Sequence, residues 1–477
     1  MTVDTTYDVV VIGGGPAGLA AAIEAHREKG ARVLVIERND SLGGILPQCI
    51  HNGFGAINFG KDLPGPEYAW RYEEELAKLP VDVLLDTMVV DLTGDLDVYA
   101  MNSTDGYLHF RPRAIVLAMG CRERTRAQIR LPGTRAAGIY TAGTVQRLVN
   151  IEGYMPGNRV VILGSGDIGM IMARRLTIEG AEVISVLELL PFLTGLRRNY
   201  VQCLQDYGIP LHLSTTVKTI HGEKRVEGIE TIQVDEQLNQ IPGTEEEIAC
   251  DTLLLSVGLI PENELSLKAG VALDDRTNGP IVDSDMATNV PGIFAAGNVT
   301  AIYDLVDYVS KAGEVAGRSA ARYAASRDTA PHRPAATPAA PLPSGDGGRT
   351  VHITPGDHVG VVIPQYLHLD DLDDRDVYIV MRPRTLLEQL VKVSLTAATP
   401  PAAESSGGES PDAGSPDANP DGDTAAGVGA APREVMSFRE QYARPAEMII
   451  RKLKPRDIEK LRDAASDGIT ELVASIA

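Results

Sequence analysis

Two stretches of the chain repeat one pattern of apolar and polar positions. The first runs through Tyr7–Gly18 and is followed, after a helical stretch, by a second apolar run at Ala31–Glu37. The second copy has the same arrangement in Arg159–Gly169 and Ala181–Glu188. The apolar runs are short and β-branched, as buried parallel strands require. Each copy therefore predicts a unit of strand, glycine-rich turn, helix and strand.

Further apolar runs predict the rest of two sheets. Three short runs between the copies predict a meander, namely Val81–Leu85, Val98–Met101 and Tyr107–Phe110. Three more runs predict buried strands, namely Ala114–Gly120, Thr252–Gly258 and Gly292–Asn298. A helical pattern follows at Leu305–Tyr323. Strands that alternate with helices in this way are typical of an α/β fold.

The composition changes after residue 325. Residues 326–349 are rich in Pro, Ala, Gly and Ser, which is typical of a linker. Residues 396–432 hold six carboxylates but no Lys, Arg or aromatic residue, so we predict an acidic insert that is disordered. Residues 350–395 and 433–477 predict a small β-rich unit. Its predicted strands are Val359–Ile363, Val377–Met381, Leu390–Leu395 and Met448–Ile450, and its predicted helix is Asp457–Ile476.

The bulk composition excludes several classes of protein. A net charge of −21 argues against nucleic acid as a partner and against adhesion to anionic membranes. No apolar run reaches ~20 residues and no signal peptide is visible, so we expect no membrane insertion and a cytoplasmic location. The cysteines are too scattered for a disulfide framework or a zinc site, and we predict no metal. They are Cys49, Cys121, Cys203 and Cys250.

The first turn carries the pattern G-x-G-x-x-G at Gly13, Gly15 and Gly18. Gly13 permits the tight turn, the missing Cβ of Gly15 lets backbone N–H groups approach a pyrophosphate, and Gly18 lets the helix pack close to the strand. The phosphates then lie at the helix N-terminus, where unpaired N–H groups favour anions. Glu37 ends the following strand, where its carboxylate can accept the ribose hydroxyls of an adenosine.

The second turn repeats this chemistry at Gly164, Gly166 and Gly169, with Glu188 at the end of its following strand. One such pattern is a weak signal, because an ordinary glycine turn can produce it. Two copies, each between a strand and a helix and each with an acidic partner at the same spacing, predict two dinucleotide sites. Glu188 would repel a 2′-phosphate, which favours NADH over NADPH.

A family resemblance covers residues 5–325. The two turns, Glu37 and the segments Ala118–Gly120 and Thr288–Asn298 resemble the pyridine nucleotide-disulfide oxidoreductases, a superfamily of flavoproteins with two dinucleotide-binding domains. The resemblance implies that the first turn and the segment around Gly297 hold FAD, and that the second turn holds NAD(P)H. It also implies an α/β fold of two Rossmann-like domains, the NAD(P)-binding one inserted in a discontinuous FAD-binding one. The implied boundaries are 1–125 and 285–325 for FAD and 126–284 for NAD(P).

The same resemblance implies which residues touch the cofactors. Those expected at FAD are Gly13, Gly15, Pro16, Ala17, Gly18, Glu37, Arg38, Gly44, Ala118, Gly120, Gly297 and Asn298. Those expected at NAD(P)H are Gly164, Gly166, Asp167, Ile168, Gly169, Glu188 and Gly258. Asn298 stands where many relatives have Asp, and its amide can still hydrogen-bond a ribityl hydroxyl or a phosphate oxygen.

Three segments resemble a narrower group, namely Gly43–Gly55, Met119–Thr125 and Leu255–Glu264, and Arg444–Met448 also fits it. This group is similar to FAD/NAD(P)-binding oxidoreductases that are encoded beside a flavin-dependent glycerol-3-phosphate dehydrogenase and a small cysteine-rich protein. It is also related to the FAD subunits of opine and amino-acid dehydrogenases. The resemblance makes the glycerol-3-phosphate dehydrogenase and the cysteine-rich protein candidate partners.

Cys49 and His51 are the candidate catalytic residues. Disulfide reductases of the superfamily carry two redox cysteines near the flavin, whereas the equivalent stretch here holds only Cys49. A dithiol relay is therefore not expected, and Cys49 is either a redox residue or a small core residue. His51 is either a proton donor or a hydrogen-bonded structural residue. The other cysteines are expected to be buried apolar residues.

These observations predict an FAD-dependent NAD(P)H:acceptor oxidoreductase, in which the nicotinamide exchanges hydride with the flavin and electrons pass to or from a small-molecule or protein acceptor. One alternative is a dehydrogenase, or one component of a dehydrogenase, for a small amino acid, hydroxy acid or glycerol 3-phosphate. The other is a subunit whose flavin is structural.

Overall fold

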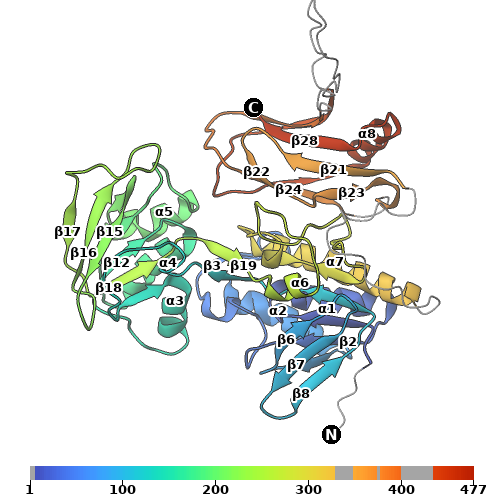
Figure 1. Cartoon of the computed structure of the whole chain (residues 1–477), viewed down its shortest axis with the longest axis horizontal. Coiled ribbons are helices and arrows are strands. Elements are labelled where there is room, and N and C mark those ends of the chain that lie inside the picture. The colour runs from blue at the N-terminus through green and yellow to red at the C-terminus, as the bar shows by residue number, and fades with distance from the viewer. Residues whose placement is uncertain (1–5, 328–347, 373–375, 399–432) are drawn as a thin grey trace, which may run out of the picture.

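The computed structural model describes residues 6–327, 348–372, 376–398 and 433–477. Figure 1 shows three parts: a first α/β part in blue and yellow, a second α/β part in green, and a C-terminal unit in orange and red above the first. The predicted fold class is confirmed, because each α/β part contains a five-stranded parallel sheet. No helix in the described ranges is long and apolar enough to cross a membrane.

The first parallel sheet has the strand order β20-β9-β1-β2-β5. Its strands are β1 (Val9–Ile12), β2 (Val33–Ile36), β5 (Asp82–Leu84), β9 (Ala114–Leu117) and β20 (Ile293–Ala295). Every residue of β1, β2 and β9 is buried, which explains their continuous apolar sequence. The chain winds outward from β1 in both directions, so a crevice opens beyond the carboxyl ends of β1 and β9, where such sheets bind ligands.

Helices α1 (Pro16–Lys29) and α7 (Val306–Ser326) pack together on this sheet. Glycines bring them close, since a Cβ on Gly313 or on Gly317 would overlap the backbone of α1. Other elements of this part are α2 (Gly65–Ala77), α6 (Glu264–Lys268), the short helices η1 (Leu46–Gln48) and η3 (Gly297–Val299), the strand pair β3 (Asn52–Phe54) and β4 (Leu63–Pro64), and the meander β6 (Met88–Leu92), β7 (Val98–Asn102) and β8 (Gly106–Phe110).

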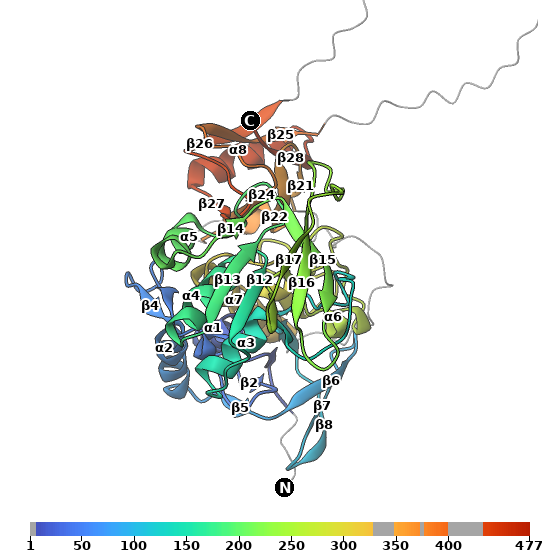
Figure 2. The same ribbon diagram turned by 90° about the vertical axis from the view of Figure 1, so that its left-hand side faces the viewer.

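The second part repeats the architecture with the order β11-β18-β12-β13-β14. The strands are β11 (Ile139–Thr141), β12 (Arg159–Leu163), β13 (Glu182–Leu187), β14 (Leu211–His212) and β18 (Thr252–Leu255). The helices are α3 (Ala142–Asn150), α4 (Asp167–Ile178) and α5 (Arg197–Cys203). Figure 2 faces this part and shows its own meander, β15 (Thr215–His221), β16 (Gly228–Gln233) and β17 (Glu246–Ile248), beside the parallel sheet.

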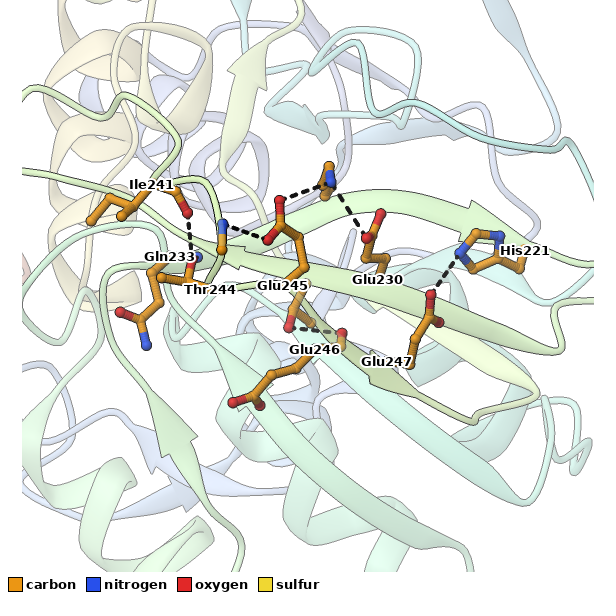
Figure 3. Close-up of polar contacts among 11 residues, drawn as sticks. His221, Glu230, Gln233, Ile241, Thr244, Glu245, Glu246 and Glu247 are labelled. Atoms are coloured by element: carbon orange, nitrogen blue, oxygen red, sulfur yellow. Dashed lines mark hydrogen bonds and ion pairs between the residues drawn. The ribbon is translucent and has the colours of Figure 1, made fainter.

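Charged pairs cross the exposed face of that meander (Figure 3). Lys218 Nζ on β15 lies 3.4 Å from Glu230 of β16 and 3.0 Å from Glu245, while His221 lies 3.4 Å from Glu247 of β17. Opposite charges on adjacent strands, such as Lys218 and Glu230, help to fix the strand pairing. The glutamates on this face therefore have partners within the meander itself.

Two short strands connect the α/β parts. β10 (Cys121–Glu123) pairs antiparallel with β19 (Leu259–Pro261), so the chain leaves the first part after β9 and returns beside its own exit. Hydrogen bonds between η1 and α3 add a second link: Gln48 Nε2 donates to Gly143 O at 2.9 Å, and Asn150 Nδ2 donates to Gln48 O at 2.8 Å.

In its described residues, the C-terminal unit has two sheets, one α-helix and the short 3-10 helix η5 (Leu369–Asp371) around a separate core. The five-stranded sheet holds β21 (Thr350–Pro355), β23 (Tyr366–His368), β25 (Val391–Ala397), β26 (Glu434–Glu440) and β28 (Glu471–Ile476). The three-stranded sheet holds β22 (Val359–Ile363), β24 (Tyr378–Pro383) and β27 (Ile449–Lys452). Ile363 and Val380 of the smaller sheet join the core of the first α/β part, which anchors the unit there.

Several predicted elements were wrong. Val81–Leu85 was predicted in the meander, but β5 pairs with β2 in the parallel sheet, and the first meander strand is β6. β5 is a short, half-exposed edge strand, so its apolar pattern does not reveal its partner. The predicted helix Asp457–Ile476 is α8 (Pro455–Ser466) followed by β28. Gly468, with φ 87°, stops the helix, and alternate residues of β28 are buried.

The predicted linker and acidic insert lie mostly outside the described residues. Ser326 still belongs to α7, and residues 328–347 are not described. Thr396 and Ala397 belong to β25, so the ordered strand is longer than predicted, and residues 399–432 are not described. Strands β21, β23 and β26 were not predicted at all.

We predict that replacing residues 399–432 with a short Gly-Ser turn leaves FAD content and melting temperature unchanged. The flanking strands β25 and β26 are antiparallel neighbours, and Ala397 N–H donates to Arg433 O at 2.8 Å, so a short turn spans the two ends. Loop length itself contributes little, ~0.6 kcal/mol per doubling. The flavin absorbance of the purified protein measures the FAD content, and differential scanning calorimetry measures the melting temperature. Val393→Asp, a charge in the core of β25, is the destabilising control, and a drop of similar size in the deletion would contradict the expectation.

Candidate active site

The two glycine turns have the same backbone geometry. Gly13 has φ 106° and Gly164 has φ 105°, a region that side chains rarely adopt. A Cβ on Gly13 would overlap Ala118 O, and a Cβ on Gly164 would overlap Ser256 O. Each first glycine therefore packs against the end of the neighbouring central strand, β9 or β18.

The other glycines of each turn have different roles. A Cβ on Gly18 would overlap Gly13 O, and a Cβ on Gly169 would lie 2.5 Å from Gly164 O, so these glycines let helix and strand pack closely. A Cβ on Gly15 would meet only Gly44 Cα at 3.7 Å. The middle glycines, Gly15 and Gly166, begin helices α1 and α4 and leave space beside unpaired N–H groups. That space fits a pyrophosphate at each turn.

Each turn is fixed to its acidic partner by matching hydrogen bonds. Glu37 accepts from Gly14 N–H at 2.7 Å and from Asn39 N–H at 2.8 Å. Glu188 accepts from Ser165 N–H at 2.9 Å and from Leu190 N–H at 3.0 Å. Both carboxylates are buried and line the cavity described below. Each oxygen of Glu37 accepts one of these bonds, and Glu188 Oε1 accepts only the one from Leu190, so each carboxylate retains an oxygen that can accept a ribose hydroxyl.

The surroundings of Glu188 distinguish the second turn from the first. Ser165 Oγ and Thr194 Oγ1 also donate to Glu188, at 2.6 and 2.9 Å. The next residues, Leu189 and Leu190, line the cavity and carry no charge. Arg198 instead extends to the first part, where its Nη2 would lie 2.6 Å from a Cβ on Gly53. The arginine thus lies against the first part of the chain.

One cavity of about 2410 Å³ is lined by both turns. The predicted cofactor residues that line it are Gly13, Gly15, Pro16, Ala17, Glu37, Arg38, Gly44, Ala118, Gly120, Asn298, Gly164, Gly166, Asp167, Ile168, Glu188 and Gly258. Gly18, Gly169 and Gly297 lie behind its wall. Gly297 lies between α1 and α7, where a Cβ on it would be only 2.8 Å from the Cβ of Ala17. Arg38 is exposed and pairs with Glu262 at 3.0 Å.

Cys49 is a protonated, buried thiol that lines the cavity. Its Sγ donates to Ile45 O at 3.4 Å and to Gln146 Oε1 at 3.6 Å. Burial raises the pKa of the Cys49 thiol to about 12, so it is not a thiolate nucleophile at neutral pH. All four cysteines are free thiols. Cys203 and Cys250 are buried as expected. Cys121 is instead half-buried and lines the cavity, and Asn298 Nδ2 donates to its sulfur at 3.6 Å.

His51 presents an unpartnered nitrogen at the cavity. Its Nδ1 lies 3.0 Å from Asn52 O, and because a carbonyl only accepts, Nδ1 carries the proton and Nε2 has the lone pair. Nε2 is buried and has no hydrogen-bond partner among the described residues. Burial lowers the pKa of His51, so the neutral ring is a proton acceptor at neutral pH rather than the donor considered from sequence.

The segment that leads into α7 also contributes to the cavity wall. Asn298 Oδ1 accepts from Tyr303 N–H at 3.0 Å, so this amide also holds the loop before α7. Asp304 Oδ2 accepts from Met448 N–H at 2.8 Å, while its buried Oδ1 has no partner in the described ranges. Asp307 is structural, since it accepts from Gly55 and Asn58 N–H groups. Orphaned polar atoms at a cavity wall favour a polar ligand.

Two residues of the site were not predicted from the sequence, namely Gln146 and Arg382. Gln146 is buried on α3 and joins Gln48 Nε2, at 3.0 Å, to the Cys49 thiol. Arg382 extends from β24 of the C-terminal unit into the cavity wall. In the sequence, the only sign of Arg382 was that a charged residue interrupts an apolar stretch. Nothing marked Gln146, because its role depends on how α3 docks.

Two equivalent turns on one cavity define a protein with two dinucleotide sites, and comparison with known proteins agrees. Residues 7–327 match the family model described as pyridine nucleotide-disulphide oxidoreductase, which is more than half of the chain. The chain therefore belongs to the pyridine nucleotide-disulphide oxidoreductase family. This membership confirms the predicted class, a flavin-dependent pyridine nucleotide oxidoreductase, and the predicted cofactors, FAD and NAD(P)H.

Individual relatives differ in their named functions. One of the opine oxidase subunits of Agrobacterium tumefaciens is 29% identical over 66% of this chain and 64% of its own length. The ferredoxin–NADP reductase of Lactiplantibacillus plantarum is 28% identical over 65% of this chain and 88% of its own length. The chain matches less than two thirds of the length of the opine oxidase relatives and only 54% of a component of the Pseudomonas putida alkyl hydroperoxide reductase.

Solved structures show the same fold. The thioredoxin reductase of T. acidophilum is similar with a TM-score of 0.56 and 24% identity, over 68% of this chain and 100% of that one. The NAD-dependent persulfide reductase of A. fulgidus is similar with a TM-score of 0.51 and 19% identity, over 82% of this chain and 68% of that one.

Gly15→Val should abolish FAD retention. A branched side chain at Gly15 would fill the space beside the N-terminus of α1, which a pyrophosphate needs. The matched control is Gly166→Val in the second turn, which should retain FAD but lose NADH binding. The flavin spectrum of each purified variant and a nucleotide titration check this. Loss of FAD from both variants, or from neither, would contradict the assignment of the turns.

Cys49→Ser should retain FAD and NADH-dependent reduction of an artificial dye, within about twofold of the wild type. The thiol is protonated and has no disulfide partner, so it cannot cycle through an internal disulfide. Steady-state dye reduction by the FAD-loaded variant measures this. A variant that keeps FAD but loses activity would assign Cys49 a direct role.

Proposed function

We propose that the chain is an FAD-dependent NAD(P)H:acceptor oxidoreductase that passes electrons to or from a separate acceptor. The observation that carries this proposal is the single cavity that both glycine turns line, because it gives two dinucleotides a common space. When bound, FAD would exchange hydride with the nicotinamide and transfer electrons onward. The residues predicted at each cofactor in the sequence, and the domain boundaries, are part of this proposal.

In this proposal, the chain orients the two cofactors and provides a residue that can accept a proton. Glu37 and Glu188 hold the two adenosine riboses, and the first turns of α1 and α4 hold the phosphates. His51 Nε2 is the lone pair available to accept a proton at the cavity. The Cys49 thiol and the Gln146 amide form a neutral, hydrogen-bonded wall rather than a redox relay.

The acceptor is the least constrained part of the proposal. The lack of a dithiol favours a separate small molecule or protein, as the names of the ferredoxin reductase and the alkyl hydroperoxide reductase component suggest for those proteins. Glycerol-3-phosphate dehydrogenase and a cysteine-rich protein remain predicted partners that rest on the sequence resemblance alone. A cytoplasmic location likewise remains a prediction.

A second candidate is one component of a dehydrogenase that acts on a small amino or hydroxy acid. The similarity to the opine oxidase relatives and to hydrogen cyanide synthase subunit HcnB favours it. The two candidates differ in what reduces the flavin. Multiple-turnover dye reduction by the FAD-loaded chain with NADH supports the first, whereas dye reduction by an acid substrate without NADH supports the second. If neither supports turnover, both proposals fail and the structural role of the flavin gains support.

NADH should be preferred over NADPH by about 10- to 100-fold in kcat/KM. Hydrogen bonds to a charged group contribute roughly 1.5–3 kcal/mol, and Glu188 would gain one from a free 2′-hydroxyl but repel a 2′-phosphate. The adjacent cavity residues, Leu189 and Leu190, offer no cation to offset that repulsion. Steady-state kinetics with both nucleotides measure the ratio. A preference for NADPH would mean that an arginine, such as Arg197 or Arg198, overrides the carboxylate.

A further inference from the structure

Arg382 brings a positive charge from the C-terminal unit to the cavity. It lies near the end of β24, is largely buried and lines the cavity. Its Nη1 donates to Pro445 O at 2.7 Å, and its Nη2 donates to Ile302 O at 2.8 Å. These two carbonyls fix the plane of the guanidinium and connect the C-terminal unit to the loop between Asn298 and α7.

The charge of Arg382 has no direct counter-ion in the parts of the chain that the structure describes. Arg451, on the adjacent strand β27, shows the contrast, because it pairs with Asp457 at 2.8 Å. Burial lowers the pKa of Arg382, and the negative charges of Asp304 and Asp167 oppose this shift. An arginine stays protonated in a protein, so a buried charge with only carbonyl partners is stabilised further by an anion.

The two acids that influence Arg382 belong to different parts of the cavity wall. Asp304 belongs to the loop before α7, in the first part, whereas Asp167 is the first residue of α4, at the second glycine turn. Asp167 is held there by Leu196 N–H and Asn199 Nδ2, at 2.8 and 2.6 Å. Arg382 thus bonds to the loop before α7 and is influenced by carboxylates of that loop and of the second glycine turn.

Each guanidinium also has five N–H donors, and the two carbonyl bonds leave others for a ligand. Their planar arrangement suits the paired oxygens of a carboxylate or a phosphate. We propose that Arg382 binds such an anionic group on the molecule that occupies the cavity beside the flavin. This inference rests on the proposed function. The anion has two sources, the phosphates of the nicotinamide dinucleotide or the carboxylate of a small acid substrate.

The test is a binding titration of the FAD-loaded, oxidised protein with three probes: NAD+, inorganic phosphate and oxalate. Isothermal calorimetry and the perturbation of the flavin spectrum both report binding without turnover. R382M should weaken at least one probe by about 10-fold or more. R384M is the matched control, because Arg384 is exposed, lies just beyond β24 and is not a cavity residue. It should bind every probe like the wild type.

The outcomes separate the two sources of the anion. Weaker binding of NAD+, with oxalate binding unchanged or absent, assigns Arg382 to the dinucleotide phosphates. Loss of oxalate or phosphate binding, with NAD+ unchanged, assigns it to a small anionic substrate. Equal affinities in R382M and the wild type overturn the proposal, as does loss of flavin from a folded R382M, which would place the guanidinium on the flavin.

Two further results are interpreted separately: an R382M variant that does not fold, and a wild-type flavin that NADH does not reduce. If R382M does not fold, R382K replaces it, because lysine keeps the charge but loses the planar fork, and unchanged binding by R382K would then overturn the proposal. A wild type whose flavin NADH cannot reduce contradicts the proposed function instead. A wild type that NADH reduces, with R382M binding all probes normally, contradicts only the assignment of Arg382.

Discussion

The close approach of bare backbone to a pyrophosphate is the constraint on which the rest of this structure depends. Phosphate groups can use the N–H groups at the start of a helix only where no Cβ intervenes, and Gly15 and Gly166 provide that space. The turn before each helix then has to be tight, and the strand before it has to lie at the centre of a parallel sheet. The buried sheets, the acidic residue at the end of the next strand and the spacing of the glycines all follow from that need, and the chain meets it twice.

A second level of organisation decides how the two sites face one another. The β10–β19 pair returns the chain beside its exit, and the hydrogen bonds between η1 and α3 hold the second part against the first. Both turns therefore line one cavity. At their junction, the chain presents a protonated thiol, a neutral imidazole and a buried amide, a lining suited to electron transfer between bound cofactors rather than to thiolate chemistry. The C-terminal unit closes this arrangement through Arg382 and through Met448, whose N–H binds Asp304.

The sequence was informative where local geometry determines function. The glycine spacing predicted both turns and the strands and helices that frame them, because each glycine answers a local steric demand. It was uninformative where partners come from distant segments. The role of β5 depends on pairing with β2, and the docking of α3 brings Gln146 to Cys49. The contact between Cys121 and Asn298 likewise joins residues far apart in the sequence. The helix predicted through residue 476 was wrong because Gly468 ends α8, and the chain beyond it changes from a helical spacing of buried residues to the alternation of a strand.

In the proposed reaction, both cofactors meet in one cavity and exchange hydride directly. A single-turnover experiment without oxygen tests this, in which the FAD-loaded chain is mixed with NADH that carries deuterium at one or the other C4 position. We expect NADH to bleach the oxidised flavin band and deuterium at only one of the two positions to slow the bleaching, because the nicotinamide presents one face to the flavin. A flavin that stays oxidised although NADH binds would show that the two cofactors do not exchange hydride.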